Sequence, residues 1–79
     1  MKFKVGDVIV YSGHFCQNEI GREQVITKTV NNKYYHTKFL DNGNWNSFDS
    51  PSNYERESIL VHSNIPYENG IPMIWEDVV

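Results

Sequence analysis

The sequence predicts an all-β domain, and its amino-acid composition is the first reason. The 79 residues include no alanine and only two leucines, but they include eight valines, seven isoleucines and eleven aromatic residues. β-Branched and aromatic side chains lose rotamer freedom in a helix and pack well on a pleated surface. The second reason is that runs of these residues are separated by clusters of glycine, asparagine and proline, which favour turns. A chain of this length forms one domain with one compact core.

The N-terminal part of the chain holds a strand and a long loop. A Gly-Asp turn leads into a β-branched run, which predicts the first strand over Val5–Tyr11. We expect the aspartate of this turn to bond nearby amides. Residues 12–22 follow without a sustained period, and we expect a loop that is pinned by Phe15 and Ile20.

Two strands joined by a hairpin come next. The second strand is predicted over Gln24–Val30 and the third over Lys33–Leu40. Asn31-Asn32 lies between them and is predicted to form the hairpin tip, because asparagine tolerates the left-handed backbone that a tight turn needs. Successive strand residues point to opposite faces, so two sets of side chains are expected in the third strand. Tyr35, Thr37 and Phe39 are expected inside, and Tyr34, His36 and Lys38 outside.

A second hairpin and one helical turn follow. Asn42-Gly43 suits the positive backbone angles of a tight turn, and it precedes a fourth strand over Trp45–Phe48. The spacing of Ser52 and Glu55 matches a capping box, in which the serine hydroxyl and the glutamate carboxylate reciprocally bond first-turn amides. This pattern predicts a helical turn over Tyr54–Glu57.

The chain ends with a fifth strand and an extension. The strand is predicted over Ser58–His62, and residues 65–79 form the extension. Prolines and a glycine interrupt this extension, yet it is too apolar for a disordered tail. Tyr67 and Trp75 are its candidate binding residues, because such side chains are enriched at interface centres. Alternatively the extension packs on its own domain and covers an open edge strand, which is the interpretation we favour.

Particular residues carry a resemblance to a known fold family. Lys4-Val5-Gly6-Asp7-Val8-Ile9 is similar to the opening K-x-G-D-x-V of small Src-homology-3-like (SH3-like) barrels, including KOW-type modules and short phage and bacterial proteins. Residues 30–35 resemble their central hairpin, and Trp45 with Ser58–Val61 resembles their late tryptophan and last strand. The resemblance implies a five-stranded SH3-like barrel over residues 1–64, with the C-terminal extension packed on it. Such barrels bind nucleic acids, peptides and proteins alike.

Charge is unevenly placed along the chain. Residues 1–65 hold seven acidic and seven basic side chains, so the net charge of −3 comes from residues 66–79. Nucleic-acid binders usually carry a basic excess, because neutralised phosphates supply much of their affinity. The composition therefore disfavours nucleic acid as a ligand, although a balanced body can still present one basic face.

No catalytic or metal-binding pattern stands out. His14 and Cys16 could join His36 and His62 at a metal, but the paired short-spacing ligands of structural zinc sites are missing. A Cys–His nucleophile pair would lack an orienting third group. We therefore expect no enzyme, cofactor or metal. The single cysteine and the lack of a long apolar N-terminal run further predict a cytoplasmic protein without disulfide, signal peptide or membrane span.

The outer face of the third strand holds the main candidate site. Tyr34, His36 and Lys38 alternate there, and Lys28 lies on the paired strand. Aromatic rings could stack bases while ammonium groups contact phosphates. The alternative is an ordinary solvated face. Trp45 could join Tyr34 in an aromatic cage for a cation or a proline-rich peptide, or it could complete the core.

The function predicted from sequence is therefore a kind of binding. The leading hypothesis is a non-enzymatic protein that engages another protein, such as a phage accessory factor or an inhibitor of a host enzyme. The alternative is a module that binds RNA or single-stranded nucleic acid through its outer sheet face. The identity of the partner and the oligomeric state are left open.

Overall fold

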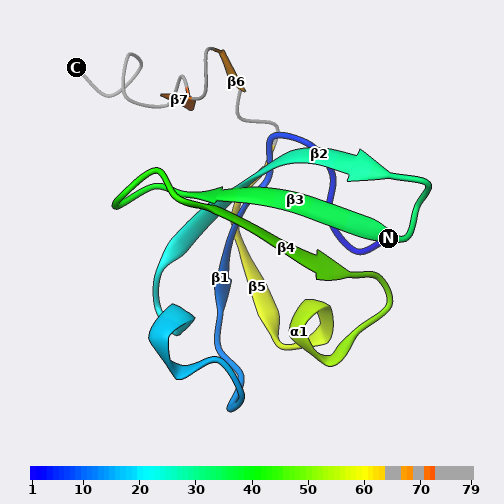
Figure 1. Ribbon diagram of the computed structural model, residues 1–79, viewed down its shortest axis with the longest axis vertical. Helices are drawn as coiled ribbons and strands as arrows, with labels where there is room; N and C mark the ends of the chain where they lie inside the picture. Colours follow the sequence, from blue (N-terminus) through cyan, green and yellow to red (C-terminus); the bar gives the residue numbers. More distant parts are fainter. Residues whose placement is uncertain (64–66, 69–70, 73–79) are drawn as a thin grey trace.

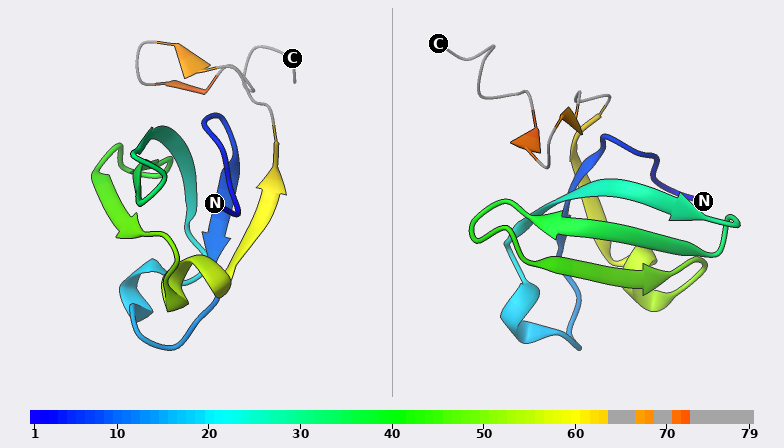
Figure 2. Two further views of the ribbon diagram at one scale, coloured as in Figure 1. Left: turned by 90° about the vertical axis from the view of Figure 1, so that its right-hand side faces the viewer. Right: turned by 45° about the horizontal axis from the view of Figure 1, so that its top comes forward.

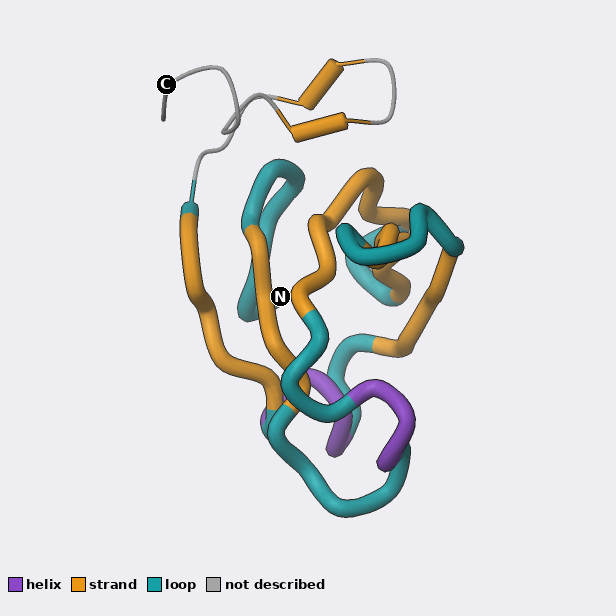
Figure 3. The backbone as a smooth tube through the Cα atoms, turned by 90° about the vertical axis from the view of Figure 1, so that its left-hand side faces the viewer, coloured by secondary structure: helices purple, strands orange, loops and turns teal. Residues whose placement is uncertain are grey.

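The computed structural model describes residues 1–63, 67–68 and 71–72, and it confirms the all-β class. Five strands form one antiparallel sheet in the order β4-β3-β2-β1-β5 (Figure 1). They are β1 (Val8–Tyr11), β2 (Glu23–Val30), β3 (Tyr34–Phe39), β4 (Trp45–Asp49) and β5 (Ser58–His62). A 3-10 helix, η1 (Gln17–Glu19), and one α-helical turn, α1 (Asn53–Arg56), lie at the same end of the sheet (Figure 3).

The sheet curls over its own inner face. The pairing of β2 with β3 shifts register between Ile26 and Lys28, and such bulges bend a strand. As a result, β1 and β5 cross steeply over the direction of β3 and β4 (Figures 1 and 2). β4 and β5 each have one neighbour among the described strands, so the sheet is open. The order of the five strands and of α1 is the predicted one, whereas η1 lies in the segment that was predicted as a loop, and the described strands do not close into a barrel.

The core lies on the concave side of this sheet. Its main cluster is apolar and aromatic, with Tyr54 of α1 packed against it: Phe3, Ile9, Ile26, Tyr35 and Phe48. A smaller cluster of Val8 and Val25 with Leu40 lies on the other face of the sheet, because Val25 is directly opposite Lys38. The predicted alternation of β3 is confirmed, because Tyr35, Thr37 and Phe39 are buried while Tyr34 and His36 are exposed.

The predicted turns are confirmed in their backbone geometry. Asn31 and Asn32 have φ values of 54° and 55°, and Gly43 has a φ of 75°. Asp7 bonds a nearby amide as expected, because its carboxylate accepts from the Lys4 N–H at 3.0 Å. β1 begins at Val8 rather than Val5, since the positive φ of Gly6 places the preceding residues in the turn.

The prediction that Phe15 and Ile20 pin the long loop is wrong. Phe15 is 73% exposed and Ile20 is 43% exposed. The loop is instead held by Tyr11, whose buried hydroxyl accepts from the Phe15 N–H at 3.0 Å and whose carbonyl accepts from the Gly21 N–H at 3.1 Å. Polar contacts to one buried tyrosine thus replace the expected apolar contacts.

One of the two hydrogen bonds of the predicted capping box is present at the start of α1. The Ser52 hydroxyl accepts from the Glu55 N–H at 3.1 Å, which confirms Ser52 as the N-cap. The predicted reciprocal bond from a first-turn amide to the Glu55 carboxylate is not formed. The carboxylate turns into the protein instead. The helical turn also begins one residue earlier than predicted, at Asn53.

Glu55 forms a buried carboxylate cluster at this end of the sheet. Its carboxylate accepts from the Tyr35 hydroxyl, from the Ser50 hydroxyl at 2.8 Å and from the Lys2 N–H at 3.0 Å. The Tyr35 hydroxyl in turn accepts from the Phe3 N–H at 3.0 Å. Burial would raise the pKa of Glu55, but these hydrogen bonds outweigh it and lower the pKa below its usual value. One charge thus joins the N-terminal segment, β3 and α1.

The C-terminal extension is described only in part. β6 (Tyr67–Glu68) and β7 (Ile71–Pro72) pair as an antiparallel two-stranded sheet. The predicted packing of the extension on the barrel, and the predicted binding role of Trp75, lie outside the described residues. In the described part of the chain, every helix is too short to cross a membrane.

We predict that Tyr35→Phe will lower the free energy of unfolding by about 1–3 kcal/mol, because it leaves the buried Phe3 N–H without a partner and removes one of the three donors to the Glu55 carboxylate. Urea denaturation measures this loss. The matched control is Tyr34→Phe, which removes the same hydroxyl from a half-exposed ring and should change stability by less than about 0.5 kcal/mol. Equal effects of the two substitutions would contradict the role given to the cluster.

The lowered pKa of Glu55 also predicts how stability depends on pH. The folded state prefers the charged carboxylate, so its stabilising contribution is complete above the unfolded pKa and is lost as pH falls through the lower folded pKa. Glu55→Gln should therefore be less stable than the natural chain near neutral pH, and the difference should shrink in acid. Urea denaturation from about pH 7 to about pH 2 tests this. A difference that stays constant over that range would contradict it.

Candidate functional site

Five of the residues predicted to bind lie on one surface of the sheet. Lys28 is directly opposite His36, and Lys38 is directly opposite Trp45. Directly opposite residues of antiparallel strands project from the same face, and β3 places Tyr34 on that face as well. We call this surface the outer platform: Lys28, Tyr34, His36, Lys38 and Trp45. The structure brings these residues together, whereas Tyr67 lies in β6 outside the five-stranded sheet.

Trp45 is the most exposed ring of the outer platform. It is 65% exposed at the start of β4, so it does not complete the core as one interpretation had it. The Lys38 ammonium lies 5.0 Å from the centre of its indole ring, which is a cation–π distance. An exposed aromatic surface and a positive charge therefore stand side by side.

Tyr34 marks the other end of the outer platform. It is 46% exposed and lies directly opposite Asp49. Trp45 is paired with Lys38, and Lys38 is four residues from Tyr34 on β3. Four residues span about 13 Å along a strand. A pocket beside Tyr34 contains Asp49 but not Trp45. The two rings therefore do not share one aromatic cage.

The charge of the outer platform differs from that of the whole chain. Lys28, Lys33 and Lys38 have no ion-pair partner among the described residues, where the single ion pair joins Arg22 to Asp41 at 2.7 Å. Of the seven acidic side chains in residues 1–63, five accept hydrogen bonds from other described groups: Asp7, Glu19, Asp41, Glu55 and Glu57. The bond from Arg22 lowers the pKa of Asp41. The outer platform thus holds two lysines without an ion-pair partner among the described residues, although the net charge of the chain is negative.

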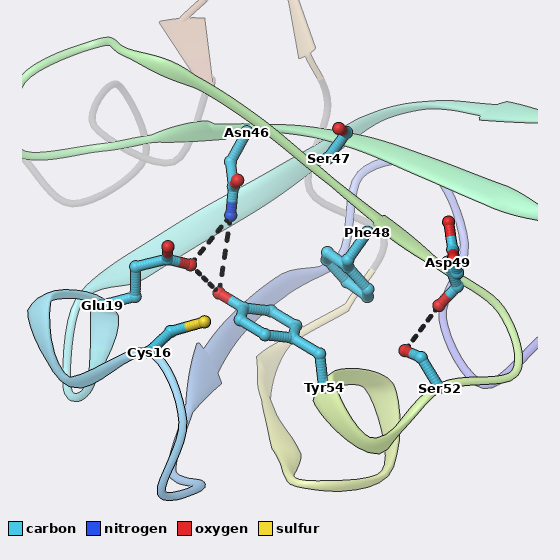
Figure 4. Close-up of a pocket in the computed structure, with 8 residues that line it drawn as sticks. All are labelled: Cys16, Glu19, Asn46, Ser47, Phe48, Asp49, Ser52 and Tyr54. Carbon is cyan, nitrogen blue, oxygen red and sulfur yellow. Dashed lines mark hydrogen bonds between the residues drawn. The ribbon is translucent and has the colours of Figure 1, made fainter.

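A second depression lies between the long loop, β4 and α1 (Figure 4). The Tyr54 hydroxyl donates to the Glu19 carboxylate at 2.5 Å and accepts from the Gln24 amide at 2.7 Å. The Asn46 amide donates to Glu19 at 3.0 Å. Burial raises the pKa of Tyr54 well above its usual value, so its hydroxyl stays a donor. These polar groups satisfy one another, which indicates a structural network.

Cys16 borders the same depression. Burial, followed by the nearby Glu19 carboxylate, raises the pKa of its thiol, so the reactive thiolate is disfavoured. In the part of the chain that the structure describes, no three side chains of the His, Cys, Asp or Glu type gather where they could hold a metal ion. This geometry supplies neither an activated nucleophile nor a ligand set.

Sequence reasoning missed the roles of Asp49, Tyr54 and Glu55. The alternation of β4 could have placed Asp49 outward, but no local signal reveals that Glu55 turns inward. Comparison of the chain with protein-family models, with curated proteins and with solved structures yields no match. Its function is therefore inferred from the residues themselves.

Proposed function

We propose that this protein is a non-enzymatic binding module that holds single-stranded nucleic acid on the outer platform. The observation that carries the proposal is the exposed Trp45 ring beside the Lys38 ammonium. The directly opposite pair of Lys28 and His36 lies on the same face of the sheet. Flat exposed rings stack on bases, and lysines neutralise the phosphates between them.

The arrangement of the platform favours a single strand over a duplex. Trp45 and Tyr34 offer exposed rings at two ends of β3 and β4, and such rings can contact only bases that are not already stacked in a helix. The negative net charge does not oppose this proposal, because residues 1–65 hold equal numbers of acidic and basic side chains and the net charge of −3 comes from residues 66–79. The lysines of the platform remain free to attract phosphates.

Binding of a labelled oligouridine, measured by fluorescence anisotropy across salt concentrations, tests the proposal. Replacing Lys28 and Lys38 together by alanine should reduce the slope of log affinity against log salt by about 1.4, since each lost phosphate contact removes about 0.7. Trp45→Ala should weaken binding by about 1–3 kcal/mol, the value of one stacked base.

The matched control replaces Lys4 and Arg56 by alanine, which changes the net charge equally but leaves the platform intact. It should leave the salt slope nearly unchanged. Absence of any binding at low salt would overturn the proposal, and equal slopes for the two double variants would assign binding to net charge rather than to the platform.

A second candidate function is engagement of another protein, such as a phage accessory factor or an inhibitor of a host enzyme. One observation favours it: Phe15 is 73% exposed on a loop that is fixed by hydrogen bonds to Tyr11. An exposed aromatic side chain on a loop whose backbone is held by hydrogen bonds is a typical anchor of a protein interface. A Phe15→Ser variant that retains a captured partner would exclude this surface.

For the fold, we propose a small SH3-like barrel whose C-terminal extension packs against β5. The support for this proposal is that Ile59, Leu60 and Val61 are 57%, 47% and 41% exposed. An edge strand with three consecutive exposed apolar residues is a liability unless something covers it. The extension follows β5 directly along the chain and is itself apolar.

Deleting residues 64–79 tests the packing of the extension. Each apolar side chain that it buries should contribute about 1.5–3 kcal/mol, so we expect the melting temperature of the shortened chain to fall by at least about 4–8 °C. Differential scanning calorimetry measures the change. An unchanged melting temperature together with loss of a protein partner would instead make the extension a binding strip.

A further inference from the structure

The outer platform ends in a pocket beside Tyr34. Tyr34 and Asp49 are directly opposite each other on β3 and β4, and both line this pocket. The Ser50 N–H donates to the Lys33 carbonyl at 2.7 Å, so the two segments that form the pocket walls are joined by a hydrogen bond. An exposed ring and a carboxylate therefore stand at one concave site.

Asp49 differs from most acidic residues of residues 1–63. Its side chain is exposed, and among the described residues none donates a hydrogen bond to its carboxylate or forms an ion pair with it. Only its backbone carbonyl is engaged, by the Ser52 hydroxyl at 2.6 Å (Figure 4). Two carboxylate oxygens thus remain available as acceptors next to an aromatic ring.

A carboxylate on a surface that attracts phosphates would repel the backbone of a nucleic acid. It becomes useful when it meets the edge of a base, because base edges carry N–H donors. Lys33 lines the same pocket, and its ammonium is available to the neighbouring phosphate. The pocket therefore offers a stacking surface, an acceptor pair and a cation within the reach of one nucleotide.

We infer that this pocket selects guanine within the single strand bound by the platform, with Tyr34 stacking on the base and Asp49 accepting from its Watson–Crick edge. Guanine alone among the common bases carries two adjacent donors on that edge, N1–H and N2–H, which match the two oxygens of a carboxylate. Uracil and thymine present a single donor between two carbonyl oxygens, and those oxygens would be repelled. This inference rests on the proposed function of the platform.

The experiment compares two labelled RNAs by fluorescence anisotropy: five uridines, and the same strand with guanosine at the centre. We expect the guanosine strand to bind about 5- to 100-fold more tightly, the discrimination of one bidentate contact. Asp49→Asn keeps the shape of the side chain but removes one acceptor and the charge, so it should abolish the preference without weakening oligouridine binding. Glu23→Gln removes the same charge elsewhere and should retain the preference.

The outcomes separate the inference from the proposal on which it rests. Equal affinity of the natural chain for the two strands, or a guanosine preference that survives Asp49→Asn, would overturn the role of the pocket while leaving the platform in place. Failure to bind either strand would overturn the platform and the pocket together.

Discussion

The buried carboxylate of Glu55 is the interaction on which the rest of the structure depends. A charge in a protein interior is strongly unfavourable unless hydrogen bonds replace its water. Here the donors come from Lys2, Tyr35 and Ser50, which lie in three separate segments of the chain. Because no single segment could satisfy the carboxylate alone, the N-terminal segment, β3 and α1 are required to meet at one point.

The cluster also sets the orientation of β3, and through it the outer platform. Side chains alternate along a strand, so a slip of one residue would move every inward side chain to the outside. The Tyr35 hydroxyl can reach both Phe3 and Glu55 only if Tyr35 points inward. Tyr34, His36 and Lys38 then necessarily point outward, and pairing with β2 and β4 brings Lys28 and Trp45 alongside them. An interaction in the core thereby determines which residues can meet a ligand.

Features that depend on short stretches of sequence could be predicted. The limits of β5, the alternation of β3 and the left-handed Asn31-Asn32 turn follow from period and turn propensity, which act over a few residues. The inward turn of Glu55 could not, because its partner Lys2 is 53 residues away in sequence. Long-range structure also decides the fate of Phe15 and Ile20. Their apolar side chains predict packing, but the folded chain leaves both of them exposed.

The net charge of the chain does not describe the charge of each of its surfaces. A formal count sums charge over the whole sequence, but residues 1–65 hold seven acidic and seven basic side chains, and the net charge of −3 comes from residues 66–79. Five of the seven acids in residues 1–63 accept internal hydrogen bonds, whereas Lys28 and Lys38 of the outer platform have no ion-pair partner among the described residues. The negative total therefore coexists with a positively charged face. Asp49 lies on that face as well, directly opposite Tyr34, and its exposed carboxylate is the group on which the inferred guanine pocket depends.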